Sequence, residues 1–192
     1  MTFGNNQPQN KVAKNRAFTL VEILVAVSIF SFLVAALSGI FVTSLQSQRQ
    51  GLASQLLIND TSYNLEYISR LLRMARKQTA SFPTCLSQAG LNYEITRGGQ
   101  GVKFLNYQGI CYEIYLEGTR IYQNKGGEIL PITSQNLEVS SLKFNLYGQS
   151  EIDNLQPRVT VYFYIKNKGQ KPEEQSEIKV QTTVSQRELD TR

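Results

Sequence analysis

At 192 residues the chain is long enough for one ordinary domain with an appendage. It has no histidine, the commonest general base and the commonest zinc ligand, and it has neither a nucleophile elbow nor a phosphate-binding loop. The formal net charge of +5 gives weak grounds for nucleic-acid binding, because Lys11, Lys14 and Arg16 near the N-terminus carry three of those charges. We therefore expect a chain that is not an enzyme and needs no cofactor.

Residues 1–17 are polar, contain Pro8 and carry basic but no acidic side chains. Because they lack a periodic apolar pattern, we interpret them as a disordered leader peptide. Basic residues directly before an apolar segment predict an N-terminus in the cytoplasm and a C-terminal part outside it.

An apolar run extends from Phe18 to Leu45. As a helix it would be roughly 42 Å long, which exceeds the ~30 Å hydrocarbon core of a bilayer, so we expect a transmembrane helix over residues 18–45. Glu22 is the only ionisable side chain between Ala17 and Gln48. A carboxylate within a membrane helix costs about 3 kcal/mol and usually has a partner or a function. The alternative is that Glu22 lies at the membrane interface and reaches water.

Beyond Leu45 the chain becomes more polar while a helical period persists. The spacing predicts an amphipathic continuation within residues 46–80, with the helix ending near Lys77. A basic cluster, Arg70, Arg73, Arg76 and Lys77, matches the negative end of the helix dipole, and a phosphate-binding patch is the alternative. The expected core-facing stripe consists of Leu45, Leu52, Leu56, Tyr63, Tyr67, Leu71 and Met74.

From about Leu91 the apolar period changes to two, which indicates strands separated by glycine turns. In residues 158–166, Val159, Val161, Phe163 and Ile165 share one face. These alternating strands need a partner to cover one face, and the amphipathic half of the helix is the obvious one. We therefore predict an α+β fold with an antiparallel sheet domain over residues 81–192. The expected strands are 93–96, 102–107, 110–116, 120–123, 137–147, 158–166 and 177–186.

The two cysteines, Cys85 and Cys111, both follow the apolar run. Outside the cytoplasm an even pair favours a disulfide, and two thiols without histidine cannot complete a tetrahedral zinc site. The alternative is two buried free thiols that pack as small hydrophobic groups.

The loop of residues 148–157 holds three oxygen-bearing side chains, Glu151, Asp153 and Asn154. Their spacing is not that of an EF-hand loop, so we expect a charged surface loop there and no metal site.

The N-terminal pattern of a basic leader, Ala17, Phe18, Thr19-Leu20-Val21, Glu22 and a long apolar run resembles the precursors of type IV pilins and of type II secretion pseudopilins. The resemblance implies cleavage between Ala17 and Phe18 by a prepilin peptidase, which also N-methylates the new Phe18 terminus. It implies that Glu22 pairs with the terminal amine of a neighbouring subunit. Ala17 departs from the family pattern, in which glycine precedes the cut.

The long helix, the cysteine-containing sheet and the chain ending from Ile178 to Arg187 resemble the larger minor pilins and the J-type minor pseudopilins. The implied function is a structural subunit of a type IV pilus or a secretion pseudopilus. The implied partners are the peptidase, other pilin subunits, a membrane assembly platform and membrane lipid. The implied location is the inner membrane and then the filament outside it.

Two alternatives remain open at this point. A pilus-tip subunit could bind DNA or a surface through tyrosine-rich strands and the basic cluster at the helix end. Ordinary signal peptidase could instead cut after Ser38, because Ala36-Leu37-Ser38 satisfies its small-residue rule, and release a soluble domain that begins at Gly39.

Overall fold

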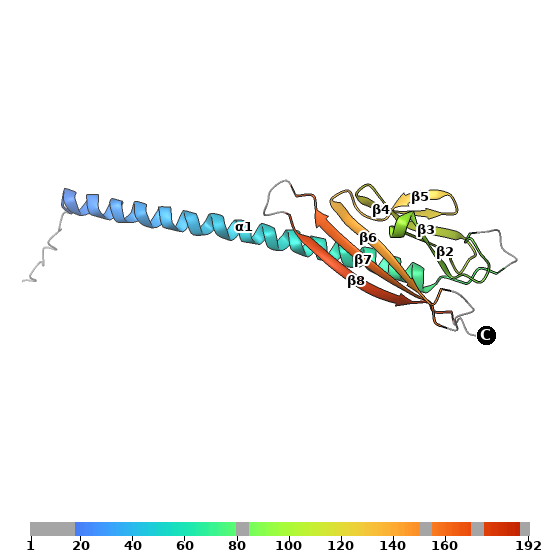
Figure 1. Ribbon diagram of the computed structural model, residues 1–192. Helices are drawn as coiled ribbons and strands as arrows, with labels where there is room; N and C mark the ends of the chain where they lie inside the picture. The colour runs from blue at the N-terminus through green and yellow to red at the C-terminus, as the bar shows by residue number, and fades with distance from the viewer. Residues whose placement is uncertain (1–17, 80–84, 150–154, 170–174, 189–192) are drawn as a thin grey trace, which may run out of the picture. The chain divides into compact units, whose positions relative to one another are not determined.

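The computed structural model describes residues 18–79, 85–149, 155–169 and 175–188. Within these residues one long helix, α1 (Leu20–Arg73), precedes eight strands and a short 3-10 helix, η1 (Arg97–Gly99) (Figure 1). The chain divides into two compact units, Met1–Ser44 and Leu45–Arg192. The first contains the apolar start of α1, and the second contains the rest of α1 and all the described strands. The predicted α+β class is confirmed.

Five strands of the second unit form an antiparallel sheet in the order β1-β2-β3-β4-β5. Each strand pairs with the next along the chain, which confirms the predicted antiparallel arrangement of the first three. The strands are β1 (Tyr93–Thr96), β2 (Gly101–Leu105), β3 (Cys111–Glu117), β4 (Arg120–Lys125) and β5 (Glu128–Pro131).

Three longer strands form a second antiparallel sheet in the order β6-β7-β8. They are β6 (Leu137–Tyr147), β7 (Arg158–Asn167) and β8 (Glu177–Ser185). The predicted alternation in β7 is confirmed, because Val159, Val161, Phe163 and Ile165 are all fully buried. A register shift between Val139 and Ser141 marks an irregularity in β6.

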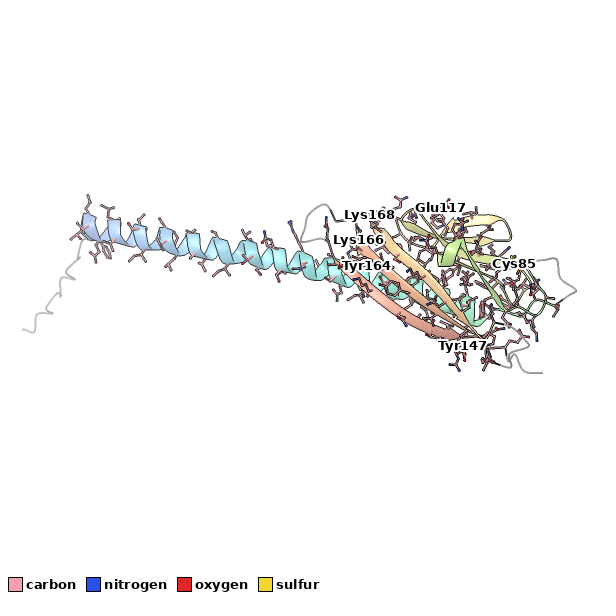
Figure 2. All side chains as sticks on the ribbon, viewed as in Figure 1. Cys85, Glu117, Tyr147, Tyr164, Lys166 and Lys168 are labelled. Atoms are coloured by element: carbon pink, nitrogen blue, oxygen red, sulfur yellow. A yellow bond between two sulfur atoms is a disulfide. The ribbon has the colours of Figure 1, made fainter. Side chains whose placement is uncertain are left out.

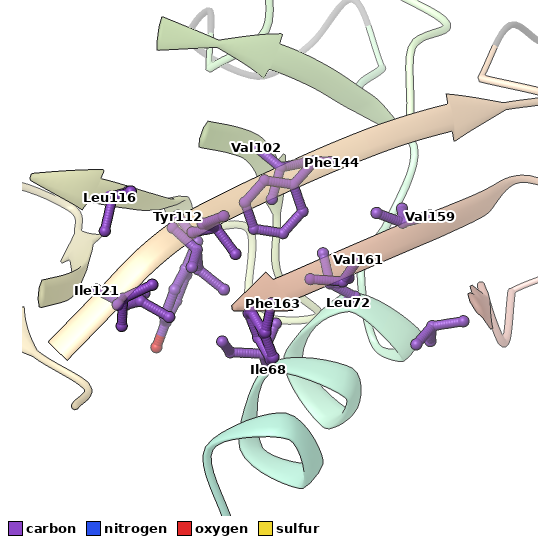
Figure 3. Packing of buried hydrophobic residues seen from close by; sticks show 14 of the residues in the cluster. Ile68, Leu72, Val102, Tyr112, Leu116, Ile121, Phe144, Val159, Val161 and Phe163 are labelled. Carbon is purple, nitrogen blue, oxygen red and sulfur yellow. The ribbon is translucent and has the colours of Figure 1, made fainter. Parts of the chain in front are cut away.

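One hydrophobic core joins α1 to both sheets in the second unit. Figure 3 shows Ile68 and Leu72 of α1 beside Phe163 and Val161 of β7, all four fully buried. Burying such side chains contributes about 1.5–3 kcal/mol each, so the sheets hold this part of the helix mainly by apolar contact. The buried stripe of α1 consists of Leu57, Thr61, Asn64, Ile68 and Leu72.

The core-facing stripe predicted from the sequence is only partly correct. Tyr67 and Leu71 are half-buried and pack against the core, but the prediction is wrong at earlier positions of the stripe. Leu52, Leu56 and Tyr63 are 60%, 62% and 71% exposed. At 3.6 residues per turn they lie about 140° around the helix from the buried stripe. The helix carries apolar residues on two faces. The sheets cover the face that also holds the polar residues Thr61 and Asn64. A prediction that counts apolar residues ranks this face lower because of those two side chains.

The helix also ends earlier than predicted, at Arg73 rather than near Lys77. Ala75 closes a last turn by donating to the Leu72 carbonyl, and Arg76 then forms an isolated bridge with Leu105 of β2. Pairing with the sheet therefore replaces the last helical turn.

The sequence prediction missed strand β5, whose residues are all exposed and show no alternation. The signal that could have found it is the Gly126-Gly127 pair between β4 and β5, since two glycines favour a tight hairpin turn. Both adopt positive φ angles, of 58° and 103°.

Candidate functional site

The helix α1 begins directly behind Phe18, in a turn capped by Thr19. The Thr19 Oγ1 accepts a hydrogen bond from the backbone N–H of Glu22 at 3.3 Å. The Thr19 carbonyl accepts from the N–H groups of Glu22 at 3.1 Å and Ile23 at 3.3 Å. Threonine followed three residues later by glutamate is the sequence of a capping box. This spacing is the signal that predicts a start at Leu20 rather than at Phe18, where the apolar run begins.

The Glu22 side chain lies in the first turn of α1 and is exposed. A carboxylate there interacts favourably with the positive end of the helix dipole, by about 0.3–1 kcal/mol. Among the residues that the structure describes, none forms a hydrogen bond or an ion pair with this carboxylate. Phe18 is exposed one turn away, and Ala17 lies outside the described residues. The Glu22 carboxylate therefore has no partner among the described residues and is available to pair with a second molecule.

Four hydroxyl groups in the apolar half of α1 have partners inside the helix. Ser28, Ser31 and Ser38 each donate to the carbonyl four residues earlier at 2.8 Å. Thr43 donates to the Ile40 carbonyl at 2.9 Å. Polar groups in hydrocarbon must be satisfied internally, so these bonds make the segment compatible with a bilayer.

The same half of the helix is long and apolar enough to cross a membrane. Its most apolar 18-residue window has no buried residue, unlike the core helix of a soluble protein. The exposed side chains include bulky ones such as Phe30, Phe32 and Phe41. Exposed apolar surface of this extent marks a membrane or protein contact.

Cys85 and Cys111 form a disulfide, with their Cα atoms 5.4 Å apart. The bond attaches the loop that follows α1 to the start of β3, so the disulfide that the sequence favours is present (Cys85 is labelled in Figure 2). Closing a loop of 26 residues contributes about 3 kcal/mol in the chain-entropy model. The disulfide joins two backbone segments of the second unit and lies far along the chain from Glu22, so its role is structural.

Gln78 holds the same loop and was not singled out by sequence reasoning. Its buried side chain accepts hydrogen bonds from the backbone N–H groups of Cys85 at 2.9 Å and Leu86 at 2.7 Å. It donates to the carbonyls of Leu86 at 3.0 Å and Gln88 at 3.3 Å. No local sequence signal marks a glutamine for this role, because its four partners are set by the path of the loop.

The basic cluster at the end of α1 is partly neutralised by acidic neighbours. Arg70 lies 3.5 Å from Glu66 on the helix surface. Arg76 lies 3.4 Å from Glu188 and donates to the Tyr107 carbonyl at 3.2 Å. This arrangement fits the interpretation of a solvated helix end better than that of a phosphate-binding patch.

No group of three or more potential ligands that could hold a metal ion occurs in the described ranges. Glu151, Asp153 and Asn154 lie outside those ranges, so the expectation of an ordinary loop there stays a prediction.

Residues 12–38 match the prokaryotic N-terminal methylation motif. No curated protein and no solved structure matches the chain. The matched segment contains Ala17, Phe18 and Glu22 and the first turns of α1. Such a motif implies processing by a prepilin peptidase and assembly with other pilins, as a structural subunit. The methylation motif and the long apolar helix behind it are together consistent with a type IV pilin-like protein.

Proposed function

We propose that this chain is the precursor of a minor pilin or pseudopilin, a structural subunit of a type IV pilus or a type II secretion-like filament. The observation that carries the proposal is the methylation motif over residues 12–38. The helix that follows has no charged side chain between Glu22 and Arg49. The C-terminal strand pattern noted above supports a minor subunit.

The proposed organisation follows from the polarity of the chain. A basic leader, residues 1–17, stays in the cytoplasm until a prepilin peptidase cuts between Ala17 and Phe18. Residues 18–45 anchor the subunit in the inner membrane, and residues 46–192 lie outside, where the rest of α1 carries the two sheets. The disulfide between Cys85 and Cys111 supports the location of residues 46–192 outside the cytoplasm, because such bonds persist in oxidising compartments.

The cut creates a charge that assembly can use. The new Phe18 amine lies at the start of α1, one turn from the Glu22 carboxylate, and each is unfavourable alone in lipid. In the proposed filament Glu22 of one subunit pairs with the Phe18 amine of a neighbour, so that assembly relieves both charges and sets the displacement between subunits.

Mass spectrometry of the mature N-terminus tests the proposal. We expect N-methylated Phe18 as the first residue, and at least as much cleavage in an Ala17→Gly control, which restores the usual residue before the cut. A mature protein that begins at Gly39 would support release by signal peptidase and overturn the proposal.

A DNA- or surface-binding tip subunit has less support. Two arginines of the basic cluster, Arg70 and Arg76, already lie beside Glu66 and Glu188. Salt-sensitive DNA binding that is lost on neutralising Arg73 and Arg76 would be the result that favours it.

A further inference from the structure

Two cations without partners lie just beyond the end of the apolar run. Arg49 is the first charged residue after Leu45, four residues and about 6 Å further along α1. Lys168 directly follows β7, and Figure 2 shows it near Lys166 at the same end of that strand. In the part of the chain that the structure describes, neither the Arg49 nor the Lys168 side chain forms an ion pair or a hydrogen bond, and both residues are exposed.

The end of β7 is held against α1 close to Arg49. The Asn167 side chain donates to the Ala53 carbonyl at 2.8 Å. Ala53 lies one helical turn beyond Arg49, so Lys168 is held about 12 Å along the helix from Leu45. A lysine side chain extends its ammonium group away from its own backbone toward a charged or wet surface. Both cations therefore serve the same short stretch of the second unit.

Arg49 and Lys168 line one hollow in the protein surface, with a volume of about 490 Å³. Its floor is apolar, because Leu52 and Leu56 lie along it. Asn136 lines it as well, and its carboxamide group can donate a hydrogen bond. A guanidinium, an ammonium and a carboxamide group are all donors to phosphate oxygens, and the two charged ones bind them strongly. The hollow therefore fits a group that carries a phosphate.

Acidic side chains do not neutralise this end of the hollow. Asp60 also lines the hollow, but it lies 11 residues and about 16 Å further along α1 than Arg49. Two glutamates line a neighbouring hollow and already have partners in the second sheet, Glu138 with Lys166 at 2.9 Å and Glu177 with Tyr164. The end of the hollow that is nearer to Leu45 is thus positively charged.

The proposed function places this positive end at the level of the lipid headgroups. The headgroup layer extends about 5–8 Å beyond the hydrocarbon core. With Leu45 at the boundary of the hydrocarbon, Arg49 lies in this layer and Lys168 lies at its outer limit. The apolar run is longer than the core is thick, and a tilt of the helix that accommodates the excess brings both cations nearer to the membrane plane.

We propose that Arg49 and Lys168 bind the phosphate group of an anionic phospholipid in the outer leaflet of the inner membrane. The proposal rests on the proposed function, which places residues 18–45 in that membrane. Two cations favour a lipid whose headgroup keeps its negative charge, as phosphatidylglycerol does. In phosphatidylcholine the quaternary ammonium group cancels the charge of the phosphate, so this lipid binds less well.

Native mass spectrometry of the full-length chain, purified from its membrane in detergent micelles, tests the site. The chain receives equal amounts of phosphatidylglycerol and phosphatidylcholine, and the ratio of the two lipid-bound forms is measured. We expect phosphatidylglycerol to be preferred by the unchanged chain. Arg49→Gln and Lys168→Gln should each lower the ratio about fivefold, the effect of one cation near an anionic lipid surface.

Matched controls remove the same charge elsewhere in the second unit. Arg73→Gln changes an exposed arginine at the other end of α1, and Lys143→Gln changes an exposed lysine in the middle of β6. Both should leave the lipid ratio unchanged. Arg49→Lys, which keeps the charge, should retain the preference.

Inorganic phosphate separates a lipid site from a site for a free anion. In large excess it should not displace phosphatidylglycerol, because the acyl chains keep the lipid phosphate at a high effective concentration beside the site. Equal binding of the two lipids by the unchanged chain, an equal loss in the control variants, or displacement by inorganic phosphate would overturn the proposal.

The mass of the chain in the same spectra identifies its N-terminus. Methylated Phe18 without a preference for phosphatidylglycerol refutes only the lipid site. A chain that begins at Gly39 refutes the pilin function itself.

Discussion

Replacing Glu22 with glutamine tests the charge pairing at the start of α1 most directly. The side chain keeps its size, and the cap survives because the Thr19 Oγ1 accepts from the backbone N–H of residue 22. What disappears is the carboxylate, which has no partner among the described residues of its own chain. The variant therefore removes the proposed interaction between subunits while the helix start stays intact.

The magnitude follows from the separation of the charges. A carboxylate and an ammonium group about 4 Å apart attract by about 4 kcal/mol at an effective dielectric constant of about 20. That free energy corresponds to roughly a thousandfold change in the equilibrium between membrane-held and assembled subunits. The favourable interaction of the carboxylate with the helix dipole, about 0.3–1 kcal/mol, is lost in both states and therefore does not change this equilibrium.

The assay compares the amount of Glu22→Gln protein in sheared filaments with the amount left in the membrane. We expect a normal membrane level and almost no incorporation. The control is Thr19→Val, which removes the side-chain cap, at a cost of about 1 kcal/mol, and keeps the carboxylate, so it should still assemble. Incorporation of Glu22→Gln at the level of the unchanged chain would refute the pairing.

Two further predictions concern the stability of the second unit, measured by denaturant unfolding of the full chain in detergent. Replacing both Cys85 and Cys111 with serine should lower the free energy of unfolding by about 3 kcal/mol, and an unchanged midpoint would contradict this. Burial raises the pKa of the Tyr93 hydroxyl, which donates to the Leu72 carbonyl at 2.7 Å. The contribution of the neutral Tyr93 hydroxyl to the stability of the folded protein is therefore complete below about pH 10, the ordinary pKa of tyrosine. This contribution is lost as the pH rises above that value, because the unfolded chain ionises first. Tyr93→Phe should cost about 1–3 kcal/mol at pH 7 and flatten the alkaline loss; an equal alkaline slope in both proteins would contradict the assignment.

Local patterns predicted much of this protein. The apolar run from Phe18 predicts the long helix, because about 28 residues without a charge other than Glu22 have few alternatives to a membrane helix. The period of two in residues 158–166 predicts the buried face of β7, because a strand with one apolar face has only one way to bury it. The disulfide was favoured by compartment and cysteine number, although only the fold brings Cys85 beside Cys111.

The choice between the two apolar faces of α1 came only from the tertiary structure. Leu52, Leu56 and Tyr63 follow a helical period as well as Leu57, Ile68 and Leu72 do, and no local rule ranks the two stripes. The sheets cover the stripe that contains Leu57, Ile68 and Leu72, and its side chains pack against β7. Leu52, Leu56 and Tyr63 of the other stripe stay exposed. The end of α1 and the hydrogen bonds of Gln78 were decided in the same way, by partners far along the chain. The sequence by itself thus determined the long helix, most of the strands and the apolar segment, because those depend on composition and period within a single segment. Which face is buried depends on contacts between segments, and only the folded chain makes those contacts.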